Sequence, residues 1–294
     1  MAGAAANKDA DAAAQPAAAR RRIWLVADDY GISPAVNAGI RDLVVRGRLN
    51  ATSCMVVAPS FAGAEISRLA VLNSRGSKVA IGLHVTLTAP FRPLTAGFRP
   101  LRRGAFPSLA ALMRRAALGR LNRAALAAEI AAQLAAFRAA FGRPPDFVDG
   151  HQHVQLLATI GETLLGAVKE KAPGAWVRQC VSAVGLLQGL SDPKGLLLDR
   201  LSRRLRARAD ALGVRTNPAF AGTYDFAARM PIGRLFPQFL DGLPDGSVVM
   251  CHPGQVDDEL RRLDPLTDLR AQEYAYLAGD EFAALLEQQG VALT

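Results

Sequence analysis

The stretch Val26-Ala27-Asp28-Asp29-Tyr30-Gly31 places an acidic pair at the point where an apolar run ends. The run from Ile23 to Ala27 is typical of a buried strand, and Gly31 follows it as a turn residue. Parallel α/β sheets carry their chemistry at the carboxyl ends of their strands. We therefore expect Asp28 and Asp29 to lie in a functional site, although an acidic pair before Tyr-Gly is equally typical of a turn and a helix cap.

Strand-like and helix-like patterns alternate along the rest of the chain. Seven or eight such β/α units, with no β-hairpin signal, predict an α/β fold with a parallel sheet. Their number favours a single domain built as a closed or nearly closed barrel of about seven strands over an open, doubly wound sheet. Further strands are expected at 51–57, 79–87, 147–149, 176–179, 214–217, 247–251 and 291–293, and helices at 34–46 (with Ser33 as N-cap), 61–72, 109–141 (with a break at Gly119), 159–171, 194–212, 231–241 and 265–289.

The length and composition are those of a chain with a sizeable core. At 294 residues, half of them apolar, the chain can fill one large domain or two small ones. No Pro/Gly/Ser-rich linker divides it, so we expect one domain over 21–294. Residues 1–20 are Ala-rich and interrupted by charges, which indicates a disordered tail rather than a signal peptide. No uninterrupted apolar run approaches the roughly 20 residues needed to cross a bilayer, so any membrane contact is expected to be peripheral.

Charge and cysteine content restrict the partners that we expect. The formal net charge of +9 comes mostly from arginine and would suit an anionic surface such as membrane headgroups. No motif interleaves aromatic with basic residues, so a nucleic-acid partner is not expected. Cys54, Cys180 and Cys251 are far apart and lack C-x-x-C spacing, which is typical of reduced thiols in a cytoplasmic protein. The sequence gives no indication of the oligomeric state.

The four histidines of the chain share one kind of position. Each closes or follows a short apolar run that is expected to be a strand. Taken singly, they have structural explanations: a hydrogen-bonded core side chain, a chance H-x-H pair, or a strand-end turn before Pro-Gly. Together with the acidic pair, they indicate one site at the carboxyl ends of the strands. The histidines are His84, His151, His153 and His252.

These residue types suit a divalent metal bound for hydrolysis, which needs a few nitrogen or oxygen ligands and one open position. Asp29, His84 and one histidine of the His151/His153 pair would supply a carboxylate and two imidazoles from three strand ends. If the strand continues through both histidines, they point the same way as Asp149. One histidine could then bind the metal while the other lines the pocket, and Asp149 could orient a ring nitrogen.

Asp28 and Asp29 are expected to do different jobs. Neighbours in an extended chain point to opposite sides, so only a turn lets both carboxylates reach one pocket, each in its own environment. This arrangement suits one metal ligand and one general base that takes a proton from water. His252 is then expected to be the acid that protonates a leaving amine or alcohol. Cys251 is a candidate nucleophile, but its position inside a strand favours a buried, unreactive thiol.

The segment from Thr88 to Ser108 contains four prolines and four arginines and follows neither a helix nor a strand pattern. Irregular segments of this length inside a compact domain are usually functional or disordered. We therefore expect this segment to form a rim that faces the substrate.

Four motifs follow one another along the chain: Ala27-Asp28-Asp29-Tyr30-Gly31, Gly82-Leu83-His84-Val85-Thr86-Leu87-Thr88, Asp149-Gly150-His151-Gln152-His153-Val154 and His252-Pro253-Gly254. In this order they resemble the signatures of the YdjC-like carbohydrate deacetylases, which are relatives of chitooligosaccharide deacetylase. The likeness runs from about Ile23 to the final helix and is greatest to the hopanoid-biosynthesis-associated, HpnK-like branch. The resemblance implies a distorted (β/α) barrel and a Mg²⁺- or Zn²⁺-dependent removal of N-acetyl groups from sugars.

The resemblance also implies roles for residues of this chain. By position in the motifs, Asp28 is the general base, while the acid role of His252 rests partly on the chemistry given above. One departure concerns Gln155, which stands where chitooligosaccharide deacetylases often have another histidine, so the substrate stays open. The implied metal ligands are Asp29, His84 and His151, and the residues expected to bind substrate or support the ligands are Tyr30, Asp149 and His153.

Several functions remain open from the sequence. In the hopanoid branch the substrate would be an N-acetylglucosaminyl hopanoid at an anionic membrane surface, which the Arg-rich segment 88–108 suits. A chitooligosaccharide is the alternative N-acetylated substrate. A glycosidase or phosphoesterase on a similar barrel is a further hypothesis, and so is a catalytically silent carbohydrate- or lipid-binding barrel that keeps the pocket.

Overall fold

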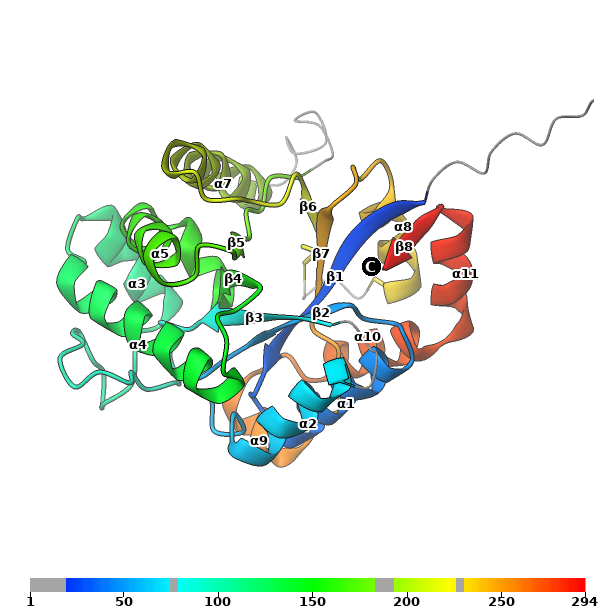
Figure 1. The fold of residues 1–294 in the computed structure, drawn as a ribbon, viewed down its shortest axis with the longest axis horizontal. Helices are drawn as coiled ribbons and strands as arrows, with labels where there is room; N and C mark the ends of the chain where they lie inside the picture. Colours follow the sequence, from blue (N-terminus) through cyan, green and yellow to red (C-terminus); the bar gives the residue numbers. More distant parts are fainter. Residues whose placement is uncertain (1–19, 75–78, 183–192, 226–229, 294) are drawn as a thin grey trace, which may run out of the picture.

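The computed structural model describes residues 20–74, 79–182, 193–225 and 230–293. Within these residues, helices surround a parallel sheet that curls on itself (Figure 1). The disordered tail expected at 1–20 lies, apart from Arg20, outside the described residues. The strands are β1 (Arg21–Tyr30), β2 (Ala51–Cys54), β3 (Ala80–Val85), β4 (Phe147–Gly150), β5 (Trp176–Val177), β6 (Phe220–Ala221), β7 (Ser247–Cys251) and β8 (Val291–Leu293).

The helices follow the expected pattern except near the C-terminus. The chain begins its first helix where predicted, because the Ser33 side chain accepts a hydrogen bond from the Val36 amide as N-cap. The single helix predicted at 265–289 is wrong, since the chain leaves helical geometry at Gly279 and forms two shorter helices. The helices are α1 (Pro34–Val45), α2 (Gly63–Ser74), α3 (Leu109–Ala117), α4 (Arg123–Phe141), η1 (a 3-10 helix, His151–Leu156), α5 (Ala158–Lys171), α7 (Pro193–Leu212), α8 (Ile232–Leu240), α9 (Asp258–Leu263), α10 (Asp268–Ala278) and α11 (Asp280–Gln288).

The strands form a nearly closed barrel. Their order across the sheet is β5-β4-β3-β2-β1-β7-β6, every pair is parallel, and β8 pairs with the first residues of β1. Two isolated parallel bridges, Val177 to Thr216 and Ser182 to Phe220, join the two outer edges of this order. The distorted (β/α) barrel of about seven parallel strands is therefore confirmed.

The prediction of a strand at 214–217 is wrong. Side-chain hydrogen bonds partly replace the backbone hydrogen bonds that such a strand would make. Thr216 makes only a single bridge, and the regular strand β6 begins at Phe220. The Asn217 amide donates to the carbonyl oxygens of Gln179 and Ala219, at 3.0 and 2.8 Å, and accepts from the Gln179 amide at 2.8 Å. Pro218 follows without an N–H, so a regular ladder cannot continue through it.

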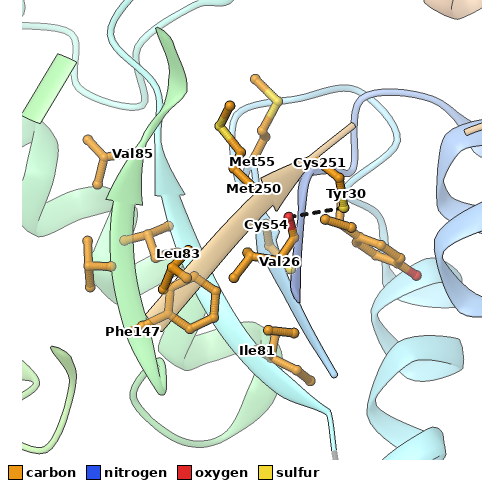
Figure 2. Packing of buried hydrophobic residues seen from close by; sticks show 14 of the residues in the cluster. Val26, Tyr30, Cys54, Met55, Ile81, Leu83, Val85, Phe147, Met250 and Cys251 are labelled. Atoms are coloured by element: carbon orange, nitrogen blue, oxygen red, sulfur yellow. Dashed lines mark hydrogen bonds between the residues drawn. The ribbon is translucent and has the colours of Figure 1, made fainter. Parts of the chain in front are cut away.

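Apolar side chains fill the barrel beneath the carboxyl ends of the strands (Figure 2). The ring of Phe147 on β4 stacks on Trp176 of β5 at 4.5 Å between centroids, and Trp176 lies 6.3 Å from Trp24 of β1. Because β1 and β5 are separated by three strands in the sheet, this row of rings crosses the barrel interior. Gly82 on β3 leaves the space for it, since a Cβ there would lie 2.4 Å from the Phe147 ring.

Among the described residues, α4 is the one helix that is long and apolar enough to cross a bilayer. Its buried face, however, carries the polar side chains Glu129 and Gln133. Gln133 hydrogen-bonds to the backbone of Thr86, and Glu129 accepts from the amides of Leu94 and Thr95. These contacts are those of a helix packed against the sheet and its loops, so its composition is weak evidence for a membrane span.

Candidate metal centre and active site

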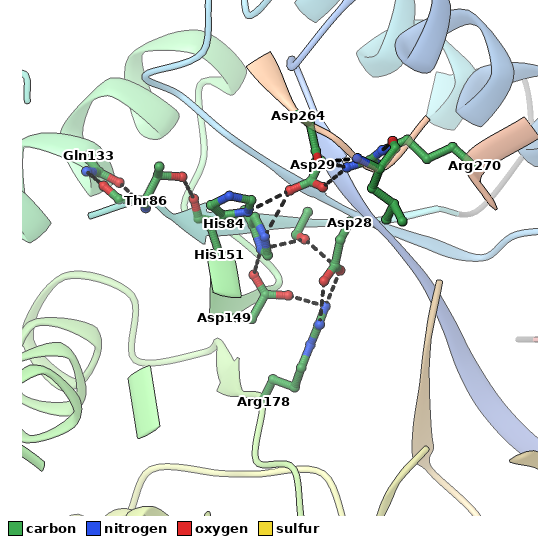
Figure 3. Close-up of polar contacts among 12 residues, drawn as sticks. Asp28, Asp29, His84, Thr86, Gln133, Asp149, His151, Arg178, Asp264 and Arg270 are labelled. Carbon is green, nitrogen blue, oxygen red and sulfur yellow. Dashed lines mark hydrogen bonds and ion pairs between the residues drawn. The ribbon is translucent and has the colours of Figure 1, made fainter. Parts of the chain in front are cut away.

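The two adjacent aspartates reach one pocket because the backbone turns between them. Asp28 still belongs to the alternating part of β1, while Asp29 has a φ of +69°, in the left-handed region. The register between β1 and β2 shifts at the same point, between Ala27 and Tyr30. A non-glycine residue in this conformation is strained, and such strain is concentrated at functional sites. Both carboxylates are buried, and Figure 3 shows them facing different partners.

Asp29 meets two histidines that come from other strand ends. Its Oδ1 lies 3.3 Å from His84 Nε2 and 3.0 Å from His151 Nδ1. One ligand atom from each of the three residues falls within 4.8 Å of the others. A carboxylate and two imidazoles are a donor set for Zn²⁺, Mn²⁺ or Mg²⁺, with Zn²⁺ suited best by the nitrogens. The residues present therefore fit a divalent cation.

His84 is held so that its Nε2 faces this cluster. Its Nδ1 lies 2.6 Å from Asp149 Oδ1 and 3.1 Å from the Ser53 hydroxyl. Carboxylates that bind the far nitrogen of a metal-ligating histidine fix its tautomer and orientation. Burial opposes a charge on His84, but the carboxylates of Asp149 and Asp28 outweigh it and raise the pKa of His84 to about 10. A cation would have to displace that proton.

Asp28 is held by an arginine that the sequence reading did not single out. Arg178 donates to both oxygens of Asp28, from Nη1 at 2.8 Å and from Nη2 at 2.5 Å, and also forms an ion pair with Asp149. Burial raises the pKa of Asp28, but Arg178 and then His84 outweigh burial and lower it to about 2. Asp28 is therefore ionised at any ordinary pH. A signal was present in the sequence, because an arginine inside the strand predicted at 176–179 has to find a partner if it is buried.

A second arginine, Arg270 of α10, was also missed. Its Nη2 lies 2.5 Å from Asp29 Oδ2 and 2.6 Å from Asp264 Oδ2, and the guanidinium is fully buried. Burial raises the pKa of Asp29, but Arg270 and His151 outweigh burial and hold it well below its ordinary value. Nothing in the helical pattern of 265–289 marks Arg270 as different from the exposed arginines of other helices. Only the tertiary structure identifies it.

The two histidines of the third motif do not point the same way, because the strand does not continue through them as that expectation required. The strand ends at Gly150, and the chain turns into η1 with Gln152 and His153 in the left-handed region, at φ of 55° and 56°. Gly150 permits this turn, because a Cβ there would lie 2.6 Å from Gln155 Oε1. His151 thus reaches Asp29, whereas His153 Nδ1 lies 3.6 Å from Cys180 Sγ.

His153 and His252 lie beside the aspartates and line the same cavity. Burial and then the charge of Arg178 lower the pKa of His153 to about 3, so this imidazole is neutral. His252 follows β7, and its backbone amide donates to Glu273 Oε2 at 2.5 Å. It is close enough for its charge to lower the pKa of Asp28. The structure thus gathers all four histidines, while the acid role of His252 stays a prediction.

A comparison with protein-family models places this arrangement in a known group. Residues 22–288 match the family described as YdjC-like protein. The chain is a member of that family. The resemblance read from the four motifs is confirmed at the level of the YdjC-like family.

Named relatives of this YdjC-like protein are deacetylases. The chitooligosaccharide deacetylase of Yersinia pestis (strain Pestoides F) is 33% identical over 154 residues, which are 50% of this chain and 55% of the relative. The match therefore spans little more than half the length of that relative. The chitooligosaccharide deacetylase of Klebsiella pneumoniae (strain 342) is 28% identical over 246 residues, which are 81% of this chain and 84% of the relative.

A solved structure shares the fold of the YdjC-like chain. A protein of Enterococcus faecalis V583, named for cellobiose-phosphate cleavage, superposes with a TM-score of 0.69 at 21% identity. The superposition covers 94% of this chain and 97% of the other. At that identity the likeness supports the barrel architecture alone.

Tyr30 has a different place from the one expected, as a substrate-binding or supporting residue. Its ring points away from the three candidate metal ligands. Its hydroxyl donates to the Glu65 carbonyl oxygen of α2 at 2.8 Å and accepts from Arg41 at 3.0 Å. The tyrosine is fully buried. The strained turn at Asp29 sends the next side chain outward, so Tyr30 fastens α2 to the barrel instead.

The three cysteines are buried, and Cys251 matches the expectation of a buried, unreactive thiol. Cys54, Cys180 and Cys251 are all buried and free. Cys251 donates to the Val26 carbonyl oxygen at 3.4 Å, inside the strand layer (Figure 2). Burial raises the pKa of its thiol well above the ordinary value, which leaves little thiolate.

The site opens into a cavity of about 910 Å³. Its floor is polar and contains Asp28, Asp29 and the four histidines, while its walls are mostly apolar. The segment 88–108, expected to be the rim, contributes none of the lining residues among those that the structure describes. It packs on α4 instead. Its Phe91 lies beside the site, with its ring centroid 5.9 Å from that of His151 in a T-shaped arrangement. The apolar wall residues are Leu109, Met113, Val154, Leu156, Leu157, Leu197, Leu198, Leu201, Met250, Pro265, Leu266 and Leu269.

Proposed function

We propose that this YdjC-like protein is a metal-dependent N-deacetylase that hydrolyses the acetamide of an N-acetylglucosamine-containing carbohydrate or glycolipid. The observation that carries the proposal is the convergence of Asp29, His84 and His151 within 4.8 Å, with an ionised Asp28 beside them. Metal-assisted hydrolysis of an amide uses such a donor set together with a base. The chitooligosaccharide deacetylase names of the relatives agree with this chemistry.

The residues that would hold the cation are Asp29, His84 and His151. When bound, a divalent cation such as Zn²⁺ or Mg²⁺ raises the acidity of water and polarises a carbonyl oxygen. The chain prepares the ligands in advance, because Asp149 orients His84 and Arg270 occupies the far oxygen of Asp29. Preorganised ligands avoid reordering at the moment of binding.

Asp28 is proposed to be the base that accepts the proton of the attacking water. Arg178 donates to both oxygens of the Asp28 carboxylate and so fixes its orientation, and the charge of Arg178 keeps Asp28 ionised. A carboxylate whose pKa is about 2 is a weak base, so it suits a water molecule that has been made more acidic than in bulk. The water oxygen then forms a bond to the acetyl carbonyl carbon.

His252 is proposed to complete the reaction as the acid. It lines the cavity near Asp28 but comes from β7, a strand on the other side of β1 from β2 and β3. When the bond between the carbonyl carbon and the sugar nitrogen breaks, a proton from His252 to that nitrogen gives the free amine and acetate. The neutral His153 offers a polar contact to the substrate without adding charge.

The finer proposal for the substrate is an N-acetylglucosaminyl hopanoid, deacetylated at a membrane surface by a cytoplasmic, peripherally bound enzyme. The apolar walls of the cavity support a lipid-linked acceptor, since a free oligosaccharide would place hydroxyl groups against leucine side chains. The three free thiols support a reducing compartment. A chitooligosaccharide is the alternative, and it has the names of the relatives in its favour.

Product analysis tests the proposal against its competitors. The purified chain is incubated with a chitooligosaccharide and, separately, with an N-acetylglucosaminyl lipid, each with added Mg²⁺, Zn²⁺, Mn²⁺ or Co²⁺. Mass spectrometry is expected to show the loss of one acetyl unit, with release of acetate that stops on chelation. A new reducing sugar end or free phosphate would instead establish a glycosidase or phosphoesterase, and tight binding without any product would establish a silent barrel.

The two substrates separate the finer choices. Faster acetate release from the lipid-linked sugar than from the oligosaccharide at equal concentration supports the glycolipid proposal. The reverse order would assign the chain to oligosaccharides and would leave the apolar walls without a role in substrate recognition.

A further inference from the structure

Two exposed apolar side chains stand at the mouth of the active-site cavity. Met113 on α3 and Leu197 on α7 both line the cavity, yet 38% and 49% of their surfaces are exposed. One helical turn away from each, Leu109 and Leu201 continue the apolar lining. We call Met113 and Leu197 the apolar rim. An apolar path therefore leads from the protein surface toward the polar floor.

Arginines that make no ion pair within the described part of the chain flank the apolar rim. Arg114 directly follows Met113 in α3. Arg200 and Arg204 lie three and seven residues after Leu197, a spacing that puts them on the same side of α7. All three are exposed, and among the described residues none has an acidic partner within ion-pair distance. Within the described residues, the positive charge of these three side chains is therefore not neutralised by an acidic side chain.

The sequence around the apolar rim is unusually poor in acidic residues. From Leu109 to Ala128 the chain has four arginines and no aspartate or glutamate. In α7 the acidic residue nearest the apolar rim, Asp199, already pairs with Arg203. An anionic partner would therefore meet little repulsion from α3 or from this part of α7. On the α10 side of the cavity, Asp268 is exposed.

We propose that the apolar rim and Arg114, Arg200 and Arg204 dock this protein on an anionic lipid bilayer, with the cavity opening at the bilayer surface. Isolated aliphatic side chains can enter the headgroup boundary while neighbouring guanidiniums bind lipid phosphates. A docked protein partner would instead be expected to cover a broad, contiguous apolar patch. The docking deepens the proposed function, on which it rests for its purpose, because a lipid-linked substrate could then enter the cavity without leaving the membrane.

Vesicle flotation of the purified chain tests the docking surface. Vesicles of phosphatidylcholine alone are compared with vesicles that also contain phosphatidylglycerol, at low and at high salt. We expect the chain to float with the anionic vesicles, and we expect salt to weaken this binding because exposed charges are screened.

Matched variants locate the surface. Leu197→Glu and Arg200→Glu are each expected to lower the partition onto anionic vesicles by at least about tenfold. Val45→Glu and Arg138→Glu make the same chemical changes on exposed side chains of α1 and α4, and should bind like the unmodified chain. The last turns of α1 and α4 lead into the starts of β2 and β4, so these controls lie at the opposite end of the barrel from the cavity.

The outcomes are separable from those of the deacetylase test. Absence of binding to anionic vesicles, or an equal loss in the control variants, overturns the docking proposal. If Leu197→Glu converts a dimer to a monomer but still binds anionic vesicles like the unmodified chain, the apolar rim serves self-association, and the docking proposal is also overturned. Vesicle binding without acetate release from any substrate would refute only the proposed function, and acetate release without vesicle binding would refute only the docking.

Discussion

Asp28 and Asp29 are neighbours in the chain, yet they belong to two differently built halves of the site (Figure 3). On one side, both oxygens of Asp28 are taken by Arg178, which also pairs with Asp149. On the other side, Arg270 holds one oxygen of Asp29, and the second oxygen faces two imidazoles. The left-handed turn at Asp29 separates the halves. The two aspartates therefore differ in chemistry because their neighbours differ. Arg178 contacts both oxygens of Asp28, whereas one oxygen of Asp29 faces the imidazoles.

The difference shows how one buried site can keep a metal-binding carboxylate apart from a carboxylate that acts as a base. A second group of three possible ligands, Asp28, His84 and Asp149, also lies close enough for a cation. Arg178 forms ion pairs with Asp28 and Asp149 of that group, so its positive charge would direct a cation to the Asp29 side. The experiments below break or sharpen the division, starting with the largest expected effect.

Replacing His84 should remove the metal side altogether. We expect His84→Ala to lose measurable metal binding and to lower acetate release by more than about 10⁴-fold, because it removes a ligand that Asp149 orients. Metal content after dialysis and calorimetric titration measure the effect. His153→Ala is the matched control, since His153 is turned toward Cys180 and should leave metal binding intact. A His84→Ala protein that retains its metal would disprove the ligand assignment.

Replacing Asp28 should leave metal binding unchanged but remove the proposed base. Asp28→Asn keeps the shape of the side chain but loses its negative charge, so turnover is expected to fall about 10²–10⁴-fold with metal content unchanged. Single-turnover acetate release and metal analysis on the same sample measure both quantities. Near-normal turnover would overturn the assignment of Asp28 as base, whatever the metal content.

Replacing Arg270 or Arg178 by lysine should weaken metal binding in the first case and turnover in the second. Lysine cannot reach two carboxylates as Arg270 does, so Arg270→Lys is expected to lower metal affinity about 10–100-fold. Arg178→Lys, the matched change on the Asp28 side, should lower turnover more than metal affinity. Calorimetry and saturation kinetics separate the two. Equal effects of both variants on metal affinity would mean that the halves are not independent.

Changing the pH should have the smallest and most graded effect. The pKa of His84 without metal is about 10, above its ordinary value, so the protonated form stabilises the metal-free fold below pH ~6.5 and this contribution is lost as the pH rises through about 10. Metal binding displaces that proton, so metal affinity should rise about tenfold per pH unit between pH ~7 and ~9. Calorimetry at three pH values measures the slope. His153→Ala should show the same slope, and a flat profile would contradict it.

The barrel and the gathering of the site were predictable because both follow from strand ends. An acidic pair and four histidines at the ends of apolar runs must meet if the strands are parallel neighbours, and in the structure they do. The prediction that Asp28 and Asp29 need a turn to share a pocket also matches, with Asp29 at a φ of +69°.

What the sequence could not supply were contacts made by long side chains and by turns. Arg178 and Arg270 reach across the barrel from a strand and a helix, and no local pattern encodes which carboxylate a guanidinium meets. The direction of His153 depended on Gln152 and His153 both entering the left-handed region, which is uncommon for residues other than glycine. The segment 88–108 was misplaced because its composition says that it is irregular, not which helix it packs on.

The row of rings beneath the site gives the molecule a built-in optical reporter. Trp24 and Trp176 are the only two tryptophans of the chain, and they lie 6.3 Å apart across the barrel interior. Their emission spectrum therefore follows the approach of β1 to β5 rather than an average over many positions. Stopped-flow fluorescence during refolding would time the closure of the barrel itself, without any attached dye.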